Sequence, residues 1–321
     1  MRVTLGFDTS CYTTSAAAVN EHGEVVAASR MLLPVKPGER GLRQSEAVFA
    51  HVRQMPLVTD QLKEQLKAVN AQVVAVCASA APRDEEDSYM PVFTVGFGHA
   101  KVLANVLDVP LYETSHQQGH VAAGLIGHKR PDEPFVALHL SGGTTELLAC
   151  ENGRLTLLGG CADLHAGQVV DRVGVAMGLP FPAGPHLEKL AMQYEGPVES
   201  LLPVSMEKDG LTCHLSGVET RAQQWIREGK MTREQIAAEV FDVLTRTVAR
   251  LLTGACQKSG AKKALVVGGV ASSTLLRKQL DRRLTKQRVK IDVLFGQPQY
   301  SADNAAGVAA IGMKKYLEQH G

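Results

Sequence analysis

The chain has 321 residues, of which 45% are hydrophobic and 21% charged, and its formal net charge is +1. This length accommodates one large domain or two of about 150 residues each, and we expect two. A chain so close to neutrality does not bind nucleic acid through charge spread over its whole surface. Any contact with RNA must therefore be local or shared with a partner.

The cysteines predict a reducing compartment. All six are scattered without a CxxC pair, and most lie in apolar runs, where cysteine behaves as a small hydrophobic residue. No segment reaches the roughly 18 consecutive apolar residues that a membrane-spanning helix needs. No basic leader followed by an apolar run opens the chain. We therefore expect a cytoplasmic protein without a membrane segment.

Strand and helix patterns alternate in the first half of the chain. Residues 3–30 hold three apolar, partly β-branched stretches separated by turns, which predicts a three-stranded meander. A helix, a short buried strand and two further helices follow at Ser45–Ala68, Val73–Cys77, Phe97–Leu107 and from His116 to about Ile126. Loops are expected at Pro34–Arg43 and Ala81–Pro91.

The strand pattern restarts after Pro131–Pro134. Three strands with tight glycine turns are expected at Phe135–Leu140, Thr145–Cys150 and Arg154–Leu158. Beyond them we expect helices at Gly167–Met177, His186–Tyr194 and Ile236–Ser259, a strand at Lys263–Val267, a helix to about Leu284, a strand at Val289–Leu294 and a last helix at Asp303–Glu318. The fold class is therefore α/β, with a mixed, largely covered sheet in each half.

The two halves share one local design. GFDTSCYTTSAAAV and LHLSGGTTELLAC both place a hydroxyl-rich turn between two apolar strands. Such a turn lets backbone N–H groups and hydroxyls surround a phosphate, and two such halves facing each other would form a nucleotide cleft. Taken alone, SGGTT is explained equally well as a plain hairpin turn.

A histidine pair in SHQQGH is the clearest candidate for a metal site. His116 and His120 lie four residues apart, so both imidazoles would project from one face of a helix. A distant carboxylate such as Asp303 in YSADNAAG could complete the coordination shell. With 11 histidines in 321 residues, roughly 0.4 such pairs arise by chance. The pair alone is also explained by two polar residues on an ordinary helix.

Eight stretches, in order along nearly the whole chain, resemble the TsaD family, formerly called O-sialoglycoprotein endopeptidase. They are DTSCYTTSAA, RGLRQSEAVFAHV, GFGHAKVLANVLDVPLYETSHQQGH, LSGGTTEL, AGQVVDRVGVAMGLPFPAGPHLEKLA, CHLSGVET, LVVGGVASSTLLR and YSADNAAGVAAIG. Eight colinear matches are far more specific than any one of them. That family performs the last step of threonylcarbamoyladenosine synthesis on tRNA. The resemblance implies the same activity, transfer of a threonylcarbamoyl group from threonylcarbamoyl-AMP to N6 of an adenosine.

The resemblance also implies the fold. It is the actin-like ATPase fold of sugar kinases, with two duplicated ribonuclease-H-like lobes. We expect these lobes at residues 1–130 and 131–321, with a helical insertion in the second. The last helix, at about 303–318, is expected to close back on the first lobe.

The family's site residues carry over by motif. The metal ligands become His116, His120 and Asp303, with iron or zinc as the ion. Residues that would bind the phosphate or acyl group, the ribose and the base are Leu140, Ser141, Gly142, Gly143, Thr144, Asp171, Gly184 and Ser273. ATP or AMP with magnesium is a further expected ligand. The expected partners are tRNA and TsaB-like and TsaE-like proteins, or a second copy of the chain.

Several family positions are altered in this chain. Tyr12 and Thr13 stand where two acidic residues are usual, Asp8 is the first acid, and the GPGL loop is replaced by APRDEEDSYMP. SGGHT or SGGNT, GEAFDK, SGLKT and GGVAAN become SGGTT, GQVVDR, SGVET and GGVASS, with changes at Thr144, Gln168, Glu219 and Ser273. Ser273 lacks an amide that an asparagine would offer to a nucleotide. This pattern favours a divergent paralogue.

In the expected reaction an amine attacks the carbamoyl carbon of a mixed anhydride as AMP leaves. A metal would act as Lewis acid and template, while N–H groups of Gly142 and Gly143 would stabilise developing charge. Asp8 and Ser10 are candidates for positioning the phosphate or its ion, and the sequence identifies no general base. The stretch Arg277–Lys290 has seven Lys or Arg and one acid. It is typical of a solvated helix face, and contact with RNA phosphates is its alternative explanation.

Three rival functions remain. A zinc protease is disfavoured, because Gln117 stands where the glutamate base of HExxH is needed. A catalytically silent scaffold, as TsaB relatives are for TsaD, would explain the altered charges. The third rival is carbamoyl transfer to a small molecule or a protein, as in HypF and the antibiotic carbamoyltransferases.

Overall fold

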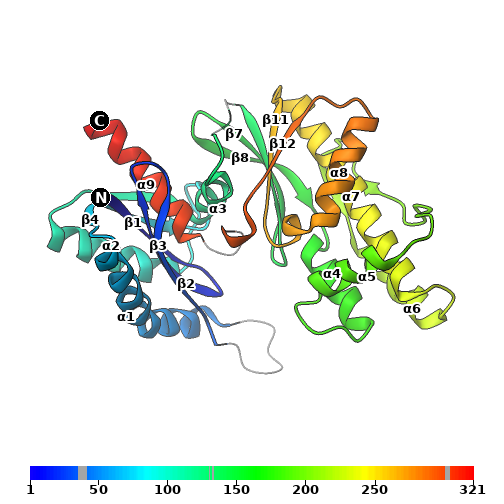
Figure 1. Cartoon of the computed structure of the whole chain (residues 1–321), viewed down its shortest axis with the longest axis horizontal. Helices are drawn as coiled ribbons and strands as arrows, with labels where there is room; N and C mark the ends of the chain where they lie inside the picture. Colours follow the sequence, from blue (N-terminus) through cyan, green and yellow to red (C-terminus); the bar gives the residue numbers. More distant parts are fainter. Residues whose placement is uncertain (35–41, 130, 132–133, 301–303) are drawn as a thin grey trace. The chain divides into compact units, whose positions relative to one another are not determined.

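The computed structural model describes residues 1–34, 42–129, 131, 134–300 and 304–321. The chain forms two compact units (Figure 1). Unit 1 consists of Met1–Lys129 and Gln299–Gly321, and unit 2 of Arg130–Pro298. The described helices include none long and apolar enough to cross a membrane.

Unit 1 is a five-stranded sheet with helices on both faces (Figure 1). Its strands are β1 (Arg2–Thr9), β2 (Thr13–Asn20), β3 (Val25–Leu32), β4 (Gln72–Ala81) and β5 (Leu111–Ser115), and its helices are α1 (Gln44–Ala68), α2 (Phe93–Leu107), α3 (His116–Leu125) and α9 (Ala305–His320). The sheet order is β3-β2-β1-β4-β5, with β1, β4 and β5 parallel. Parallel strands end at the same edge, so the last residues of β1, β4 and β5 come together where β5 enters α3.

The two faces of this sheet are covered differently. Helices α1 and α2 pack over one face in a core that contains Phe7 and Met55. Helix α9 covers the other face through Val308 and Met313. It approaches β1 so closely that a Cβ on Gly6 would lie 2.3 Å from a backbone oxygen of Ala305. Glycine at that position therefore sets how deeply the start of α9 sits against the sheet.

Unit 2 is a seven-stranded sheet in the order β12-β11-β6-β7-β8-β10-β9. Its strands are β6 (Phe135–Leu140), β7 (Thr145–Glu151), β8 (Arg154–Cys161), β9 (Ser205–Met206), β10 (Thr212–His214), β11 (Lys263–Val267) and β12 (Asp292–Phe295). Its helices are α4 (Ala166–Ala176), α5 (Gly184–Gln193), α6 (Ser216–Glu228), α7 (Arg233–Ser259), α8 (Thr274–Lys286) and the short 3₁₀ turn η1 (Val270–Ser272); a second 3₁₀ turn, η2 (Pro298–Tyr300), follows β12. The largely buried α7 runs through the core of this unit.

Most predicted elements are present, and the exceptions have physical reasons. The meander at residues 3–30 and the later meander from Phe135 are confirmed. The strand expected at Val289–Leu294 begins only at Asp292, because the N–H of Val289 still closes the last turn of α8 on the carbonyl of Leu284, at 3.0 Å. Strands β5, β9 and β10 and helix α6 were not predicted.

Candidate active site

The histidine pair opens α3 as the sequence predicts. Ser115, the last residue of β5, caps the helix by accepting a 3.1 Å hydrogen bond from the N–H of Gln118. His116 is the first residue of the helix and His120 follows one turn later. Their Nε2 atoms lie 3.1 Å apart. The cap thus fixes the point at which both imidazoles leave the helix.

Asp8 lies directly behind His116. Its carboxylate oxygens are 3.0 and 3.1 Å from Nδ1 of His116, and its side chain is buried near the end of β1. A hydrogen bond from Nδ1–H to the carboxylate leaves the His116 Nε2 lone pair facing His120. Burial alone raises the pKa of Asp8, but its attraction to His116 and the hydrogen bonds from His116 and Asn304 outweigh this effect and hold the pKa below its usual value.

Asn304 completes this arrangement from the other end of the chain. Its buried Nδ2 donates to Oδ1 of Asp8 at 3.2 Å and to the carbonyl of His116 at 2.9 Å. A Cβ on Gly119 would lie 2.5 Å from this Nδ2, so the glycine between the two histidines leaves room for the carboxamide. The Oδ1 atom of Asn304 has no hydrogen-bond partner in the described part of the chain.

The donor set fits a metal ion. Two nitrogen ligands of a tetrahedral zinc, each 2.0–2.1 Å from it, lie about 3.3 Å apart, close to the 3.1 Å between the two Nε2 atoms. A carboxylate on the far nitrogen of a ligating histidine is the usual orienting partner. The predicted third ligand, Asp303, lies outside the described residues, and the residues that are described contain no group of three His, Cys, Asp or Glu side chains suited to a metal.

The turn after Asp8 is held by a histidine that the sequence did not single out. His51 of α1 is buried, with Nε2 2.8 Å from the carbonyl of Ser10 and Nδ1 2.7 Å from the hydroxyl of Thr14. These contacts tie both ends of the DTSCYTT turn to α1. Burial lowers the pKa of His51, against smaller opposing effects of the Ser10 carbonyl and the Asp8 charge. The predicted residue Ser10 is thus placed through its backbone.

The SGGT turn of unit 2 is built by backbone contacts. The N–H of Ser141 donates to the carbonyl of Thr144 at 2.8 Å, and the N–H of Gly167 donates to the carbonyl of Ser141 at 3.0 Å. A Cβ on Gly167 would lie 2.5 Å from the backbone nitrogen of Gly142, so α4 starts against the turn only because this residue is glycine. The N–H of Gly142 has no acceptor among the described residues and is available to an anion.

A cavity of about 420 Å³ lies beside this turn, within unit 2. Asp171 of α4 faces the start of α5, where its Oδ1 accepts hydrogen bonds from the N–H groups of Ala183 and Gly184 at 2.8 and 3.2 Å. Four of the predicted residues, Gly142, Asp171, Gly184 and Ser273, line the cavity together with residues that were not predicted. Its lining is Gly142, Gly167, Val170, Asp171, Pro182, Gly184, Pro185, Glu188, Phe241, Gly269, Val270, Ser272 and Ser273. Leu140, Ser141, Gly143 and Thr144 are not part of the lining but belong to the adjoining strand end and turn.

Sequence similarity to known proteins identifies the family of the chain. The family model of TsaD, described as tRNA N6-adenosine threonylcarbamoyltransferase, matches residues 35–310. The chain belongs to the TsaD family. Proteins of the same description from Clostridium perfringens strains SM101 and ATCC 13124 are each 31% identical over 326 residues, which covers 99% of this chain and 93% of theirs. The chain is therefore a transferase of the TsaD kind.

Solved structures confirm the predicted fold class. HypF from T. kodakarensis matches with a TM-score of 0.64 at 13% identity, over 99% of this chain and 48% of that one. A ROK family glucokinase from Streptomyces griseus matches with a TM-score of 0.56 at 13% identity, over 97% and 99% of the two chains. Component A of the Acidaminococcus fermentans (R)-2-hydroxyglutaryl-CoA dehydratase matches with a TM-score of 0.55 at 16% identity, over 99% of this chain and 100% of that one. At such identities the likeness shows the actin-like ATPase fold alone.

The positions at which this TsaD member departs from the family have local structural roles. The hydroxyl of Ser273 caps α8 by accepting from the N–H of Leu276 at 3.1 Å. Gln168 accepts a 3.4 Å hydrogen bond from the N–H of His165 at the start of α4. Glu219 lies 3.8 Å from Arg172 of the neighbouring α4. The reversed charge at residue 219 thus has a cationic partner within unit 2.

Proposed function

We propose that this TsaD member transfers a threonylcarbamoyl group from threonylcarbamoyl-AMP to N6 of an adenosine in tRNA, and that it does so with one bound iron or zinc ion. The observation that carries the proposal is the pair of Nε2 atoms of His116 and His120, which lie 3.1 Å apart, with His116 oriented by Asp8. Together with the family, this arrangement supports a metal-dependent enzyme better than a silent scaffold.

The metal would be held by His116 and His120, with Asp303 as the proposed third ligand. When bound, it supplies Lewis-acid and templating chemistry. Asp8 keeps the proton of His116 on Nδ1 and so presents Nε2 as a ligand. Asn304 fixes Asp8 in turn, through its hydrogen bond to Oδ1.

The residues of unit 2 would hold the acyl-adenylate. A cavity of about 420 Å³ is large enough for the sugar and base of a nucleotide. Asp171 and the start of α5 line it, and the Gly142 N–H at its edge offers a fixed donor to phosphate. In the transfer, N6 of the adenosine forms a bond to the carbamoyl carbon and loses a proton. The bond from that carbon to the phosphate oxygen breaks, and AMP leaves. ATP or AMP with magnesium is proposed as a further ligand of the same cavity.

The direct test uses labelled threonylcarbamoyl-AMP and unmodified tRNA, with TsaB-like and TsaE-like proteins added in turn and with the chain alone. We expect labelled tRNA from the wild type and none from Asp303→Ala. Asp60→Ala, at an exposed position of α1, is the matched control and should retain activity. Wild-type protein that transfers nothing with any partner contradicts the proposal. Metal retained by such a protein would favour the scaffold instead.

The proposed compartment is the cytoplasm. The six cysteines form no disulfide in the described part of the chain, and four of them are buried. A reducing environment keeps cysteines from forming disulfides. Fractionation of cells that express a tagged chain tests this proposal, and recovery of the protein outside the cytoplasm would contradict it.

A further inference from the structure

The positive charge of the chain is concentrated in one segment of unit 2. Residues 258–290 contain ten Lys or Arg and one acid, Asp281, whereas the whole chain has a formal net charge of +1. The segment comprises the end of α7, strand β11, helix α8 and the turn before β12. The remainder of the chain is therefore acidic, and the charge of this segment stands out against it.

Two of these cations serve the fold. Arg277 donates to the carbonyls of Ala271 and Gly296, at 2.7 and 2.8 Å, and its guanidinium lies over the ring of Phe295. Arg283 donates to Asp242 of α7 at 3.1 Å. Both side chains are turned toward the body of unit 2, where they hold α8 in place. Neither is free to bind a partner.

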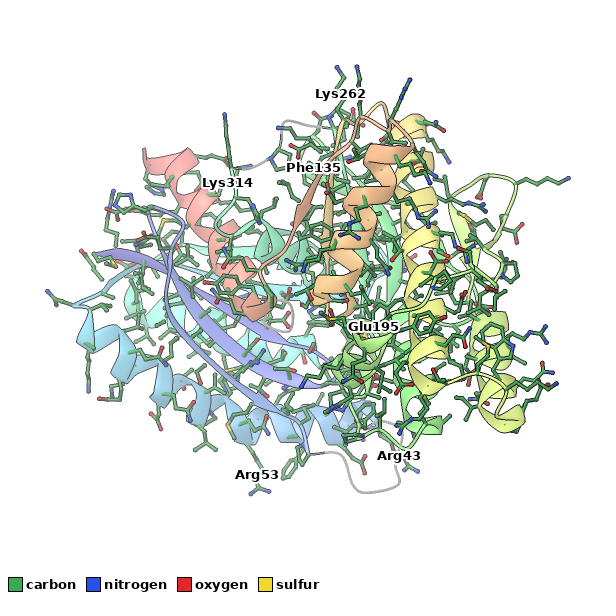
Figure 2. The ribbon with its side chains drawn as sticks, turned by 45° about the vertical axis from the view of Figure 1, so that its right-hand side comes forward. Arg43, Arg53, Phe135, Glu195, Lys262 and Lys314 are labelled. Carbon is green, nitrogen blue, oxygen red and sulfur yellow. The ribbon has the colours of Figure 1, made fainter. Side chains whose placement is uncertain are left out.

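The other cations of α8 and its following turn form an exposed surface. We call it the α8 basic face; it consists of Lys262, Lys278, Arg282, Lys286, Arg288 and Lys290, all exposed. None of them forms an ion pair with an acid in the described part of the chain. Lys262 joins the group because its carbonyl accepts a 2.9 Å hydrogen bond from the N–H of Asp292, just beyond Lys290. Figure 2 labels Lys262 at this end of unit 2.

Three cations of the α8 basic face lie in one row along the helix. Lys278, Arg282 and Lys286 recur every four residues, so they share one side of α8, about 6 Å apart along its axis. Like charges at this spacing destabilise a helix, so folding alone does not account for the arrangement. The start of α8 lies at the 420 Å³ cavity, because Ser273, which caps this end of the helix, lines the cavity. From there the face leads away from the cavity along the helix.

We propose that the α8 basic face binds the phosphate backbone of tRNA. The inference rests on the proposed function, which makes tRNA the acceptor. Lysine and arginine contacts to phosphates supply affinity and position the nucleic acid without reading its sequence. A strand held along α8 has one end at the cavity, which is where the acyl donor is proposed to lie.

The test is a charge reversal on one side of α8. The triple variant Lys278→Glu/Arg282→Glu/Lys286→Glu is compared with Arg221→Glu/Arg227→Glu/Lys230→Glu, which makes the same charge change at two exposed positions of α6 and at the exposed Lys230, two residues beyond its end. Binding of labelled tRNA is measured by fluorescence anisotropy at several salt concentrations, with and without partner proteins. We expect the α8 variant to bind at least about tenfold more weakly, with a salt slope smaller by about 2 to 3. The α6 variant should lose much less.

Transfer kinetics separate positioning from chemistry. The α8 variant should raise KM for tRNA and leave kcat at saturating tRNA unchanged. If reversal unfolds the protein, Lys278→Gln/Arg282→Gln/Lys286→Gln replaces it, with the same direction of effect. Equal binding by the α8 and α6 variants overturns the inference. So does a wild type that binds no tRNA, or one that binds only vesicles containing anionic phospholipid. A wild type that binds tRNA through this face but transfers nothing leaves the inference standing and contradicts the proposed function.

Discussion

The two candidate sites use opposite means to hold a charged ligand. In unit 1, side chains hold one another: the buried Asp8 orients His116, and the buried Asn304 fixes Asp8. In unit 2, glycines bring backbone together: Gly167 lies against Gly142, whose N–H remains available. A side-chain site depends on the chemistry of each member, whereas a backbone site depends on the absence of side chains. Substitutions should therefore harm the two sites for different reasons.

Loss of a proposed metal ligand should have the largest effect. His120→Ala removes one of the two Nε2 donors, so we expect metal affinity and transfer activity to fall by more than about 100-fold. Metal content by mass spectrometry and initial rates check this. His22→Ala, at an exposed turn of unit 1, is the control and should change neither. Full metal content in the His120 variant would show that the pair is not the binding site.

Asp8→Asn tests the orienting carboxylate and should have the next largest effect. Asparagine keeps the size of the side chain but removes the charge that holds the Nδ1 proton of His116. Loss of a carboxylate that orients a ligating histidine weakens metal binding by about 10- to 100-fold. Competition with a chelator measures the loss, with Asp60→Asn as control. Unchanged affinity would assign Asp8 a purely structural role.

Gly167→Ala tests the candidate site of unit 2, which is built from backbone groups. Its Cβ would meet the backbone of Gly142 at 2.5 Å, so the SGGT turn must shift. We expect a loss of about 1–3 kcal/mol in the free energy of unfolding and weaker nucleotide binding. Denaturant unfolding and calorimetric titration with AMP measure both. Gly217→Ala in α6 meets nothing within 4 Å and should cost no stability; equal behaviour of the two variants would contradict this account.

His51 should make the unfolding of unit 1 depend on pH. Its pKa in the folded chain lies below the ordinary 6.5, so the unfolded chain binds more protons as the pH falls below that value. The contribution of the neutral His51 to the free energy of unfolding is therefore present above pH 6.5 and declines as the pH falls below that value. His51→Gln should flatten this decline in urea unfolding between about pH 8 and about pH 5.5. The exposed His22→Gln should leave it unchanged, and an identical slope in wild type and His51→Gln would contradict the prediction.

The smallest effect is expected at Glu219. Restoring the family lysine with Glu219→Lys replaces an ion pair by a repulsion, but Arg172 is 53% exposed and 3.8 Å away. Such pairs contribute about 1 kcal/mol or less. Thermal unfolding should show a shift of a few degrees at most, with Glu195→Lys as an exposed control. A much larger loss would mean that Glu219 holds α4 and α6 together.

Local patterns explain which parts of the fold could be predicted. The meander and the helix spacing of His116 and His120 depend on neighbours in sequence, and both were found. Strand β5 is only five residues long and lacks a clear alternation, and β9 and β10 are shorter still. Helix α6 buries only Val218, Ala222 and Trp225, too narrow an apolar stripe to be recognised among its polar residues.

The sequence singled out Asp8 as a candidate that positions the phosphate or its ion, but its contact with His116 and the role of Asn304 could not be predicted, because these residues lie far apart in sequence. Asp8 and His116 are 108 residues apart, and Asn304 and Asp8 are 296 apart. A lone aspartate near the end of an apolar strand was the available signal for Asp8, but nothing local indicated its partner. Gly167 looked like an ordinary first-turn residue of a helix. Only tertiary packing against Gly142 gives it a role.

The place of Asn304 in the chain has a consequence for the timing of synthesis. Unit 1 is begun first and finished last, because residues 299–321 return to it after all of unit 2 has been made. Domains commonly fold as they leave the ribosome, the N-terminal one first. Here the His116 site lacks its Asn304 contacts until residue 304 has emerged. A chain that stops before residue 304 would therefore lack these contacts, so the proposed metal site cannot be completed until residue 304 has been synthesised.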